Sequence, residues 1–173
     1  GQYNVAVGYR ALDSADGGES NNIGIGTNVM GHINHDDSDH NVAIGDSALL
    51  GGTGTVKRNI AIGSNALGTG ISNNNQTGTV AIGYNALTSI TTGNQNTVMG
   101  VSAGRNITTG ANNVIIGRAA GYASTDVDKA VIIGEQAGYT GNMTSDADGT
   151  VSIGSGAGKN ITSGIGNVSV GFN

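Results

Sequence analysis

The stretch Asn41-Val-Ala-Ile-Gly45 recurs eighteen residues later as Asn59-Ile-Ala-Ile-Gly63, and the same pattern continues along the chain. The ten copies begin at Asn4, Asn22, Asn41, Asn59, Thr79, Asn96, Asn113, Ala130, Thr150 and Asn167, and their closing glycines lie 17 to 20 residues apart. A period of this length is typical of proteins built from stacked structural units. The repeat therefore predicts a solenoid, in which each repeat forms one coil.

Each pentapeptide alternates with a period of two residues, which is the period of a β-strand. In the third copy, Val42 and Ile44 point to one side and Ala43 to the other. We expect Val42, Ile44 and their equivalents to fill the interior of each coil, and Ala43 and its equivalents to face outward. The prediction is an all-β fold, a parallel β-solenoid of the left-handed β-roll type with about ten coils of 17 to 20 residues.

The repeat occurs in two versions. A small residue stands three positions after each of the first nine closing glycines, and the next residue is leucine or methionine in the first half and glycine in the second. Ala48-Leu49 and Ala120-Gly121 are examples. We therefore predict a single repeat domain over residues 1–173, with one version over about 1–95 and the other over 96–173. Because the pattern runs from end to end, we expect the chain to be a fragment of a longer fibre protein.

The composition limits the possible classes of function. The 173 residues include 32 glycines, one phenylalanine and no proline, tryptophan or cysteine, and the net charge is −5. Disulfides and thiolate metal sites are excluded, and an acidic chain without lysine or arginine clusters does not favour nucleic acid binding. No apolar run approaches the ~18 residues of a membrane span, so no membrane insertion is expected. We predict no cofactor.

The expected outward face of the strands carries no charged residue. We predict that this face forms an oligomer interface, and that cyclic closure produces a homotrimer. The alternative is an outer strand covered by the chain's own turns. The predicted interface residues are Ala43, Ala61, Ala81, Val98, Ile115 and Ile132.

The Asn-Val-Ala-Ile-Gly unit, followed three positions later by a small residue, resembles the head repeats of trimeric autotransporter adhesins. The Ile-Thr-Thr-Gly turns at 90–93 and 107–110 resemble repeats of phage and prophage tail fibres. These resemblances imply a trimeric β-roll. It would belong to a virion tail fibre or to an extracellular cell surface and would attach it to a target. They favour a structural and receptor-binding segment of a phage tail fibre; the head of a bacterial adhesin is the alternative. The implied partners are two further copies of the chain and a cell-surface glycan or surface protein.

Three turns carry candidate metal ligands. His35, Asp36, Asp37 and Asp39 combine imidazole and carboxylate groups, which suit transition metals and Ca²⁺. Their spacing matches no EF-hand loop, so we favour a solvated acidic turn and predict no metal site. Two aspartate pairs, at 126 and 128 and at 146 and 148, are further calcium candidates of the same kind.

Tyr122 and Tyr139 occupy the same place in adjacent coils, directly after Ala-Gly. Exposed tyrosines on neighbouring coils can stack on sugar rings, which makes the pair a candidate glycan-binding site. The alternative is that each ring packs against its neighbouring turn.

No catalytic pattern stands out, and we predict that the chain is not an enzyme. Ile44-Gly-Asp-Ser-Ala-Leu49 fits the hexapeptide of left-handed β-helix acyltransferases, but the other hexapeptides of that coil are missing. An ice-binding solenoid requires a regular threonine ladder. Thr91, Thr108 and Thr162 stack approximately, yet the first four coils lack the series.

Overall fold

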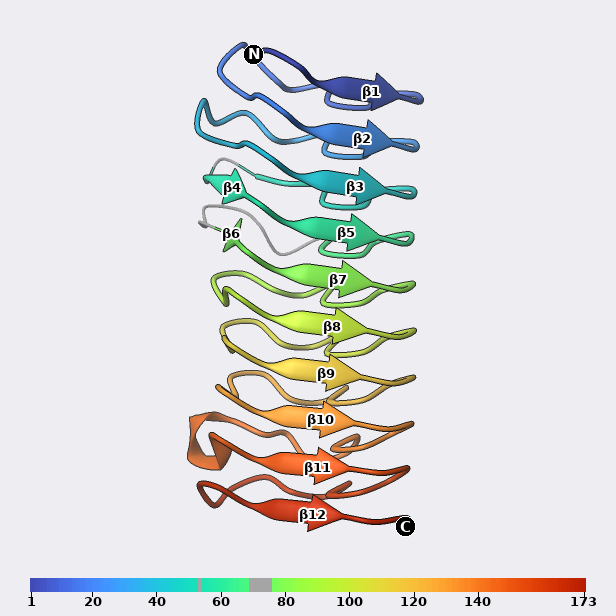
Figure 1. Cartoon of the computed structure of the whole chain (residues 1–173), viewed down its shortest axis with the longest axis vertical. Helices are drawn as coiled ribbons and strands as arrows, with labels where there is room; N and C mark the ends of the chain where they lie inside the picture. Colours follow the sequence, from blue (N-terminus) through green and yellow to red (C-terminus); the bar gives the residue numbers. More distant parts are fainter. Residues whose placement is uncertain (53, 69–75) are drawn as a thin grey trace.

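The computed structural model describes residues 1–52, 54–68 and 76–173. It confirms an all-β parallel solenoid, with about nine turns. Ten three-residue strands form one parallel sheet that runs the length of the molecule (Figure 1). In spatial order they are β1 (Val5–Val7), β2 (Ile23–Ile25), β3 (Val42–Ile44), β5 (Ile60–Ile62), β7 (Val80–Ile82), β8 (Thr97–Met99), β9 (Val114–Ile116), β10 (Val131–Ile133), β11 (Val151–Ile153) and β12 (Val168–Val170).

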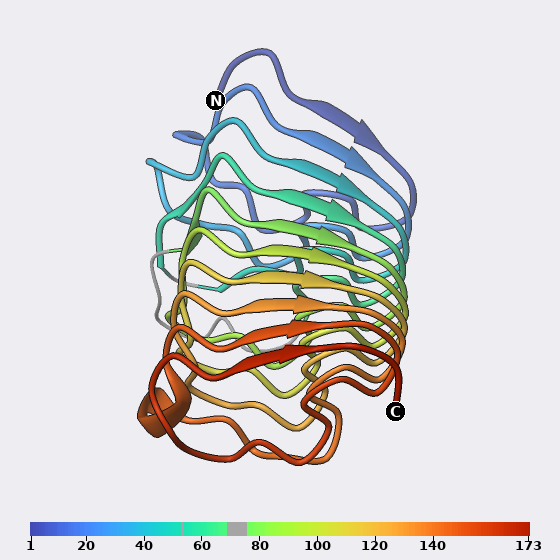
Figure 2. The same cartoon turned by 60° about the horizontal axis from the view of Figure 1, so that its bottom comes forward.

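Little other regular structure is present in the described part of the chain. The strands β4 (Val56–Lys57) and β6 (Gln76–Thr77) form a second parallel pair on the turns of two neighbouring coils. One 3₁₀ turn, η1 (Ser145–Ala147), lies in the longer loop between β10 and β11. Figure 2 shows that the strands stack directly while the loops on the far side vary in shape. The variation in repeat length is therefore confined to the loops.

Equivalent residues stack in register from coil to coil. Val42 of β3 pairs with Ile60 of β5, for example, and Ile60 pairs with Val80 of β7. The closing glycine of each strand makes this stacking possible. At Gly100, whose φ is +133°, an added Cβ would lie 2.5 Å from the carbonyl oxygen of Gly117 in the next coil. Only glycine allows both this backbone conformation and this approach.

The orientation of the strands is opposite to the sequence prediction. In the eight inner strands of the ten-stranded sheet the central residue is buried in the coil, and the two flanking residues are partly or fully exposed. Each of the predicted interface residues is fully buried in the chain's own core: Ala43, Ala61, Ala81, Val98, Ile115 and Ile132. The prediction that they form an oligomer interface is therefore wrong, because no surface of another chain can reach them.

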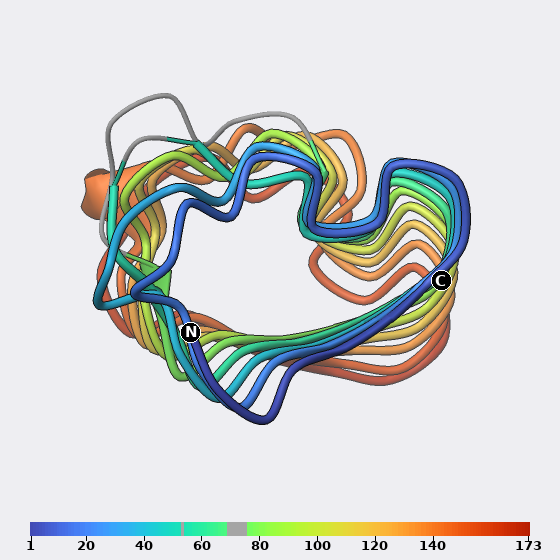
Figure 3. The ribbon, with the colours of Figure 1, turned by 90° about the horizontal axis from the view of Figure 1, so that it is seen from above.

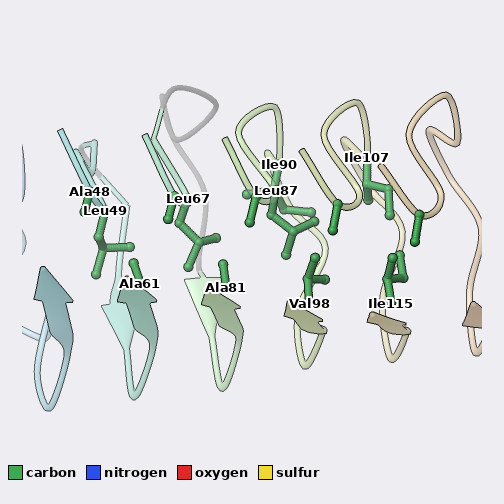
Figure 4. Packing of buried hydrophobic residues seen from close by; sticks show 14 of the residues in the cluster. Ala48, Leu49, Ala61, Leu67, Ala81, Leu87, Ile90, Val98, Ile107 and Ile115 are labelled. Atoms are coloured by element: carbon green, nitrogen blue, oxygen red, sulfur yellow. The ribbon is translucent and has the colours of Figure 1, made fainter. Parts of the chain in front are cut away.

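The physical reason lies in the opposite wall of the coil. Beyond each corner the chain folds back toward the sheet (Figure 3), and this inturned segment carries the small residue and the leucine or glycine that follows it. Figure 4 shows Leu49, Leu67 and Leu87 reaching across toward the strand residues Ala61, Ala81 and Val98. The bulk that fills the coil in the first half thus comes from the inturned segment, and alanine in the strand leaves room for it.

The second half uses the reverse arrangement. Val98, Ile115 and Ile132 supply the volume from the strand, and glycine stands on the inturned segment. At Gly121 an added Cβ would lie 3.3 Å from Ile132 Cδ1 and 3.4 Å from Ile115 Cδ1. The two versions of the repeat are therefore two ways of filling the same space at native packing density.

A ladder of buried asparagines connects the coils beside the strands. The backbone N–H of Asn59 donates to Oδ1 of Asn41 at 3.0 Å. The backbone N–H of Asn41 donates in the same way to Oδ1 of Asn22 at 2.9 Å. The Nδ2 group of Asn41 also donates to the carbonyl of Val56 at 2.7 Å, which ties the turn of the same coil to the ladder. The first residue of the pentapeptide is therefore a structural element that satisfies buried backbone groups.

Candidate functional site

The outward face of the ten-stranded sheet is a continuous surface that runs from β1 to β12. Each strand presents its first and third residues there, and among these residues only Thr97 is polar. The others are valine, isoleucine and Met99, and none of them is fully buried. We call this surface the apolar face. Exposed fractions along it include 39% at Ile25, 37% at Ile60 and 40% at Met99.

The alternation of the sequence places these valines and isoleucines on one side of the strand, but the prediction that this side is the interior is wrong. The alternation alone does not identify the side that faces the core. The pairing of leucine with a small strand residue, and of glycine with a large one, was the signal that could have decided it. Ala81 precedes Leu87, whereas Ile115 precedes Gly121.

The candidate metal ligands in the second turn are not brought together. His35 Nδ1 accepts a hydrogen bond from the backbone N–H of Asp37 at 3.2 Å, and the carboxylate of Asp37 lies 3.6 Å from Lys57 Nζ. Asp39 instead accepts a hydrogen bond from the backbone N–H of Ser20 at 2.7 Å. Nowhere in the described ranges do three histidine, aspartate or glutamate side chains gather closely enough to hold a metal ion.

The aspartates of the later turns also serve the stacking of coils. Asp128 accepts from the backbone N–H of Ala111 at 2.6 Å, and Asp148 accepts from the backbone N–H of Asp128 at 2.8 Å. Asp126 is hydrogen-bonded to the hydroxyl of Thr109, and Asp146 lies exposed in η1. Asp126, Asp128 and Asp148 therefore connect successive coils and do not converge on one point.

The two candidate glycan-binding tyrosines form the centre of a four-residue stack. The ring centroids of Tyr122 and Tyr139 lie 5.3 Å apart with an interplanar angle of 39°. Arg105 covers the ring of Tyr122 and donates to its hydroxyl at 2.9 Å, and Lys159 covers the ring of Tyr139. The ring faces thus contact one another and the two cations, which favours the packing alternative for this pair.

Two of the three threonines considered for ice binding, Thr91 and Thr108, use their hydroxyls within the chain. Thr91 Oγ1 donates to the carbonyl of Thr108 at 2.8 Å, and Thr108 Oγ1 donates to the carbonyl of Thr125 at 3.1 Å. Their hydroxyls therefore contribute to coil stacking, which does not favour an ice-binding ladder.

A polar pocket lies on the opposite side of the solenoid from the apolar face. It has a volume of about 360 Å³, and its lining spans the first three coils. The lining residues are Arg10, Asp13, Ser14, Asn28, Gly31, His32, Ser47 and Leu50. They flank the partly buried pair at 11–12 and the buried pairs at 29–30 and 48–49, so the pocket lies over the inturned segment. We call it the inturn pocket; no sequence motif had indicated it.

Comparison with protein-family models, with curated proteins and with solved structures finds no match to this chain. Within its described residues the structure contains no helix that is long and apolar enough to cross a membrane.

Proposed function

We propose that the chain is a structural segment of a homotrimeric fibre that attaches a virion or a cell to a surface. The observation that carries this proposal is the apolar face. Parallel sheets are normally covered on both sides, and their strands are apolar on both sides for that reason. Here one side is covered by the chain's own inturned segments, and the other side is apolar but exposed.

The size of the apolar face supports an interface. Ten strands at ~4.8 Å spacing and three residues at ~3.3 Å rise give a surface roughly 45 Å long and 10 Å wide, or about 450 Å² in projection. Exposed apolar patches of this size mark interaction sites in soluble proteins. No charged side chain interrupts the sheet residues that form it.

A second copy of the chain is the partner that fits best. The apolar face repeats at every coil, and another copy offers the same ladder with the same spacing over the same length. Association about an axis parallel to the solenoid keeps all coils at matching levels and closes the assembly. Threefold closure is the arrangement found in the fibre families that these repeats resemble, and it covers the apolar face of every chain.

The test is the mass in solution, measured by light scattering, together with a charge placed on the apolar face. We expect about 51 kDa, three times the 17.0-kDa chain. Ile82→Glu in β7 should dissociate the assembly, because each copy would bury an unpaired carboxylate. Thr92→Glu places the same charge on an exposed turn outside the sheet and should leave the mass unchanged. A folded wild-type chain of 17.0 kDa would overturn the proposal.

A further inference from the structure

We infer that the inturn pocket binds a neutral pyranose unit of a surface glycan. The inference rests on the proposed attachment function and names the ligand class for it. The pocket volume of about 360 Å³ falls within the range of small-molecule sites. Its lining combines a carboxylate, a guanidinium, an amide, an imidazole and two hydroxyls with the apolar side chain of Leu50.

The polar side chains of the pocket are available to a ligand. Several asparagines and aspartates of the chain form hydrogen bonds between coils, as Asn41 and Asp128 do. Among the described residues, by contrast, the side chains of Asn28 and Ser47 have no hydrogen-bond partner within the chain. Arg10 and Asp13 contact each other at 3.6 Å, and both side chains are more than half exposed.

The pocket exists because of the residue type at one position of the repeat, the fifth after the closing glycine. In the second coil this position is Gly31, which contributes no side chain. In later coils the same position holds Arg105, Tyr122, Tyr139 and Lys159, which stack on one another. The surface over the inturned segment is therefore hollow and polar in the first coils and carries the aromatic stack in the later ones.

The chemistry of the lining matches a sugar. Vicinal hydroxyls donate and accept hydrogen bonds, and the pocket offers a donor in Arg10, an acceptor in Asp13 and both in Asn28. Leu50 supplies an apolar contact for the C–H groups of the ring. The charges of Arg10 and Asp13 balance, and the chain as a whole carries a net charge of −5, which disfavours an anion. A neutral sugar is therefore favoured over an acidic one.

The position of the inturn pocket is compatible with assembly. The sheet forms one long side of the coil's cross-section, and the inturned segment lies on the other side (Figure 3). Association through the apolar face leaves the pocket open to solvent on each chain. A fibre would then present three identical pockets at one level, and such multivalency raises the avidity of weak individual sites.

The test is titration of the ¹⁵N-labelled chain, residues 1–173, with the methyl glycosides of glucose, galactose, mannose and N-acetylglucosamine. We expect at least one of them to cause saturable shifts of the amide signals of Asn28, Gly31 and His32, with a Kd in the millimolar range. Asn28→Ala should weaken binding about fivefold, the effect of one or two lost hydrogen bonds. Asp13→Asn provides a second variant, and it should weaken binding while altering an exposed ion pair of little consequence for stability.

Asn65→Ala is the matched control. Asn65 occupies the position of Asn28 two coils further on, has a similar left-handed φ (56° against 51°) and does not line the pocket. The Asn65→Ala variant should therefore lose the same preference for a left-handed backbone but keep the wild-type affinity for the glycoside. The inference is overturned if none of the four glycosides shifts the pocket signals, or if Asn28→Ala and Asn65→Ala bind equally. The mass of the same samples separates the two proposals, since a trimer that binds no glycoside removes only the inference.

Discussion

The clearest quantitative test of the fold exchanges one version of the repeat for the other within a single coil. Ala81 in β7 and Leu87 on the inturned segment are both fully buried in the last coil of the first type, and the next coil has Val98 and Gly104 in the equivalent places. The double variant A81I/L87G converts this coil to the second type. It therefore moves the boundary between the two types by one coil without creating a new kind of contact.

Each single substitution should destabilise the chain. Leu87 is fully buried, and its Cδ2 atom lies 3.3 Å from where a Cβ on Gly104 would be. L87G removes this side chain at a cost of about 3 kcal/mol. Because Leu87 has a left-handed φ of 49°, glycine recovers about 1 kcal/mol of that loss. A81I places a larger side chain against an intact leucine and costs about 2 kcal/mol.

The double variant should be much more stable than the sum of these effects predicts. An isoleucine from the strand occupies the space that the leucine leaves, as Ile115 does opposite Gly121. We expect A81I/L87G to lie within about 1 kcal/mol of the wild type, which gives a favourable coupling energy of about 3 kcal/mol. Urea denaturation followed by far-ultraviolet circular dichroism, at one fixed protein concentration, measures all four members of the cycle. Additive single effects would refute the reasoning that the two positions share one packing space.

Three further substitutions address other parts of the structure. Ser152 is fully buried in β11 and its hydroxyl has no hydrogen-bond partner, so Ser152→Ala should raise the free energy of unfolding by about 1 kcal/mol, measured by urea denaturation; a loss of stability would contradict this. Asn41→Ala should cost about 3 kcal/mol in the same assay, because it leaves buried backbone groups of two coils unpaired. The control Asn65→Ala should cost only about 1 kcal/mol, for the loss of a residue that favours a left-handed φ. Equal losses of stability would argue against the asparagine ladder. Gly100→Ala should prevent stable stacking, because the added Cβ would lie 2.5 Å from the carbonyl oxygen of the next corner, and a normal melting temperature would rule out this corner geometry.

The strands, their parallel register and the solenoid were predictable because they follow from spacing. A closing glycine every 17 to 20 residues fixes the length of a coil, and two-residue alternation fixes the strand. The direction of the side chains was not predictable from alternation alone. The larger residue of an alternating pair usually points inward, but Ala81 points inward here because Leu87 fills the coil from the opposite wall. Only the relation between strand and inturned segment could have revealed this.

The inturn pocket could not be predicted for a different reason. Its lining residues come from three coils, and no two of the coils contribute the same set of residue types. A repeat pattern shows what the coils share, whereas this pocket depends on how they differ, above all on the missing side chain at Gly31. The stack around Tyr122 and Tyr139 was visible as a repeat, yet its cationic ends at Arg105 and Lys159 became clear only in three dimensions.

The two proposals divide the solenoid into two sides with independent constraints. On the sheet side the strand of every coil packs in register between equivalent strands. Valine and isoleucine therefore recur on the outward face of the sheet, with Thr97 as its one polar residue. On the loop side the backbone of each coil is already satisfied by ladders such as that of Asn41, so the exposed side chains are free to vary. A change at Asp13 or Asn28 can therefore alter what the inturn pocket binds without disturbing the apolar face. This separation is what an attachment fibre requires, because its binding surface can change while its assembly is retained.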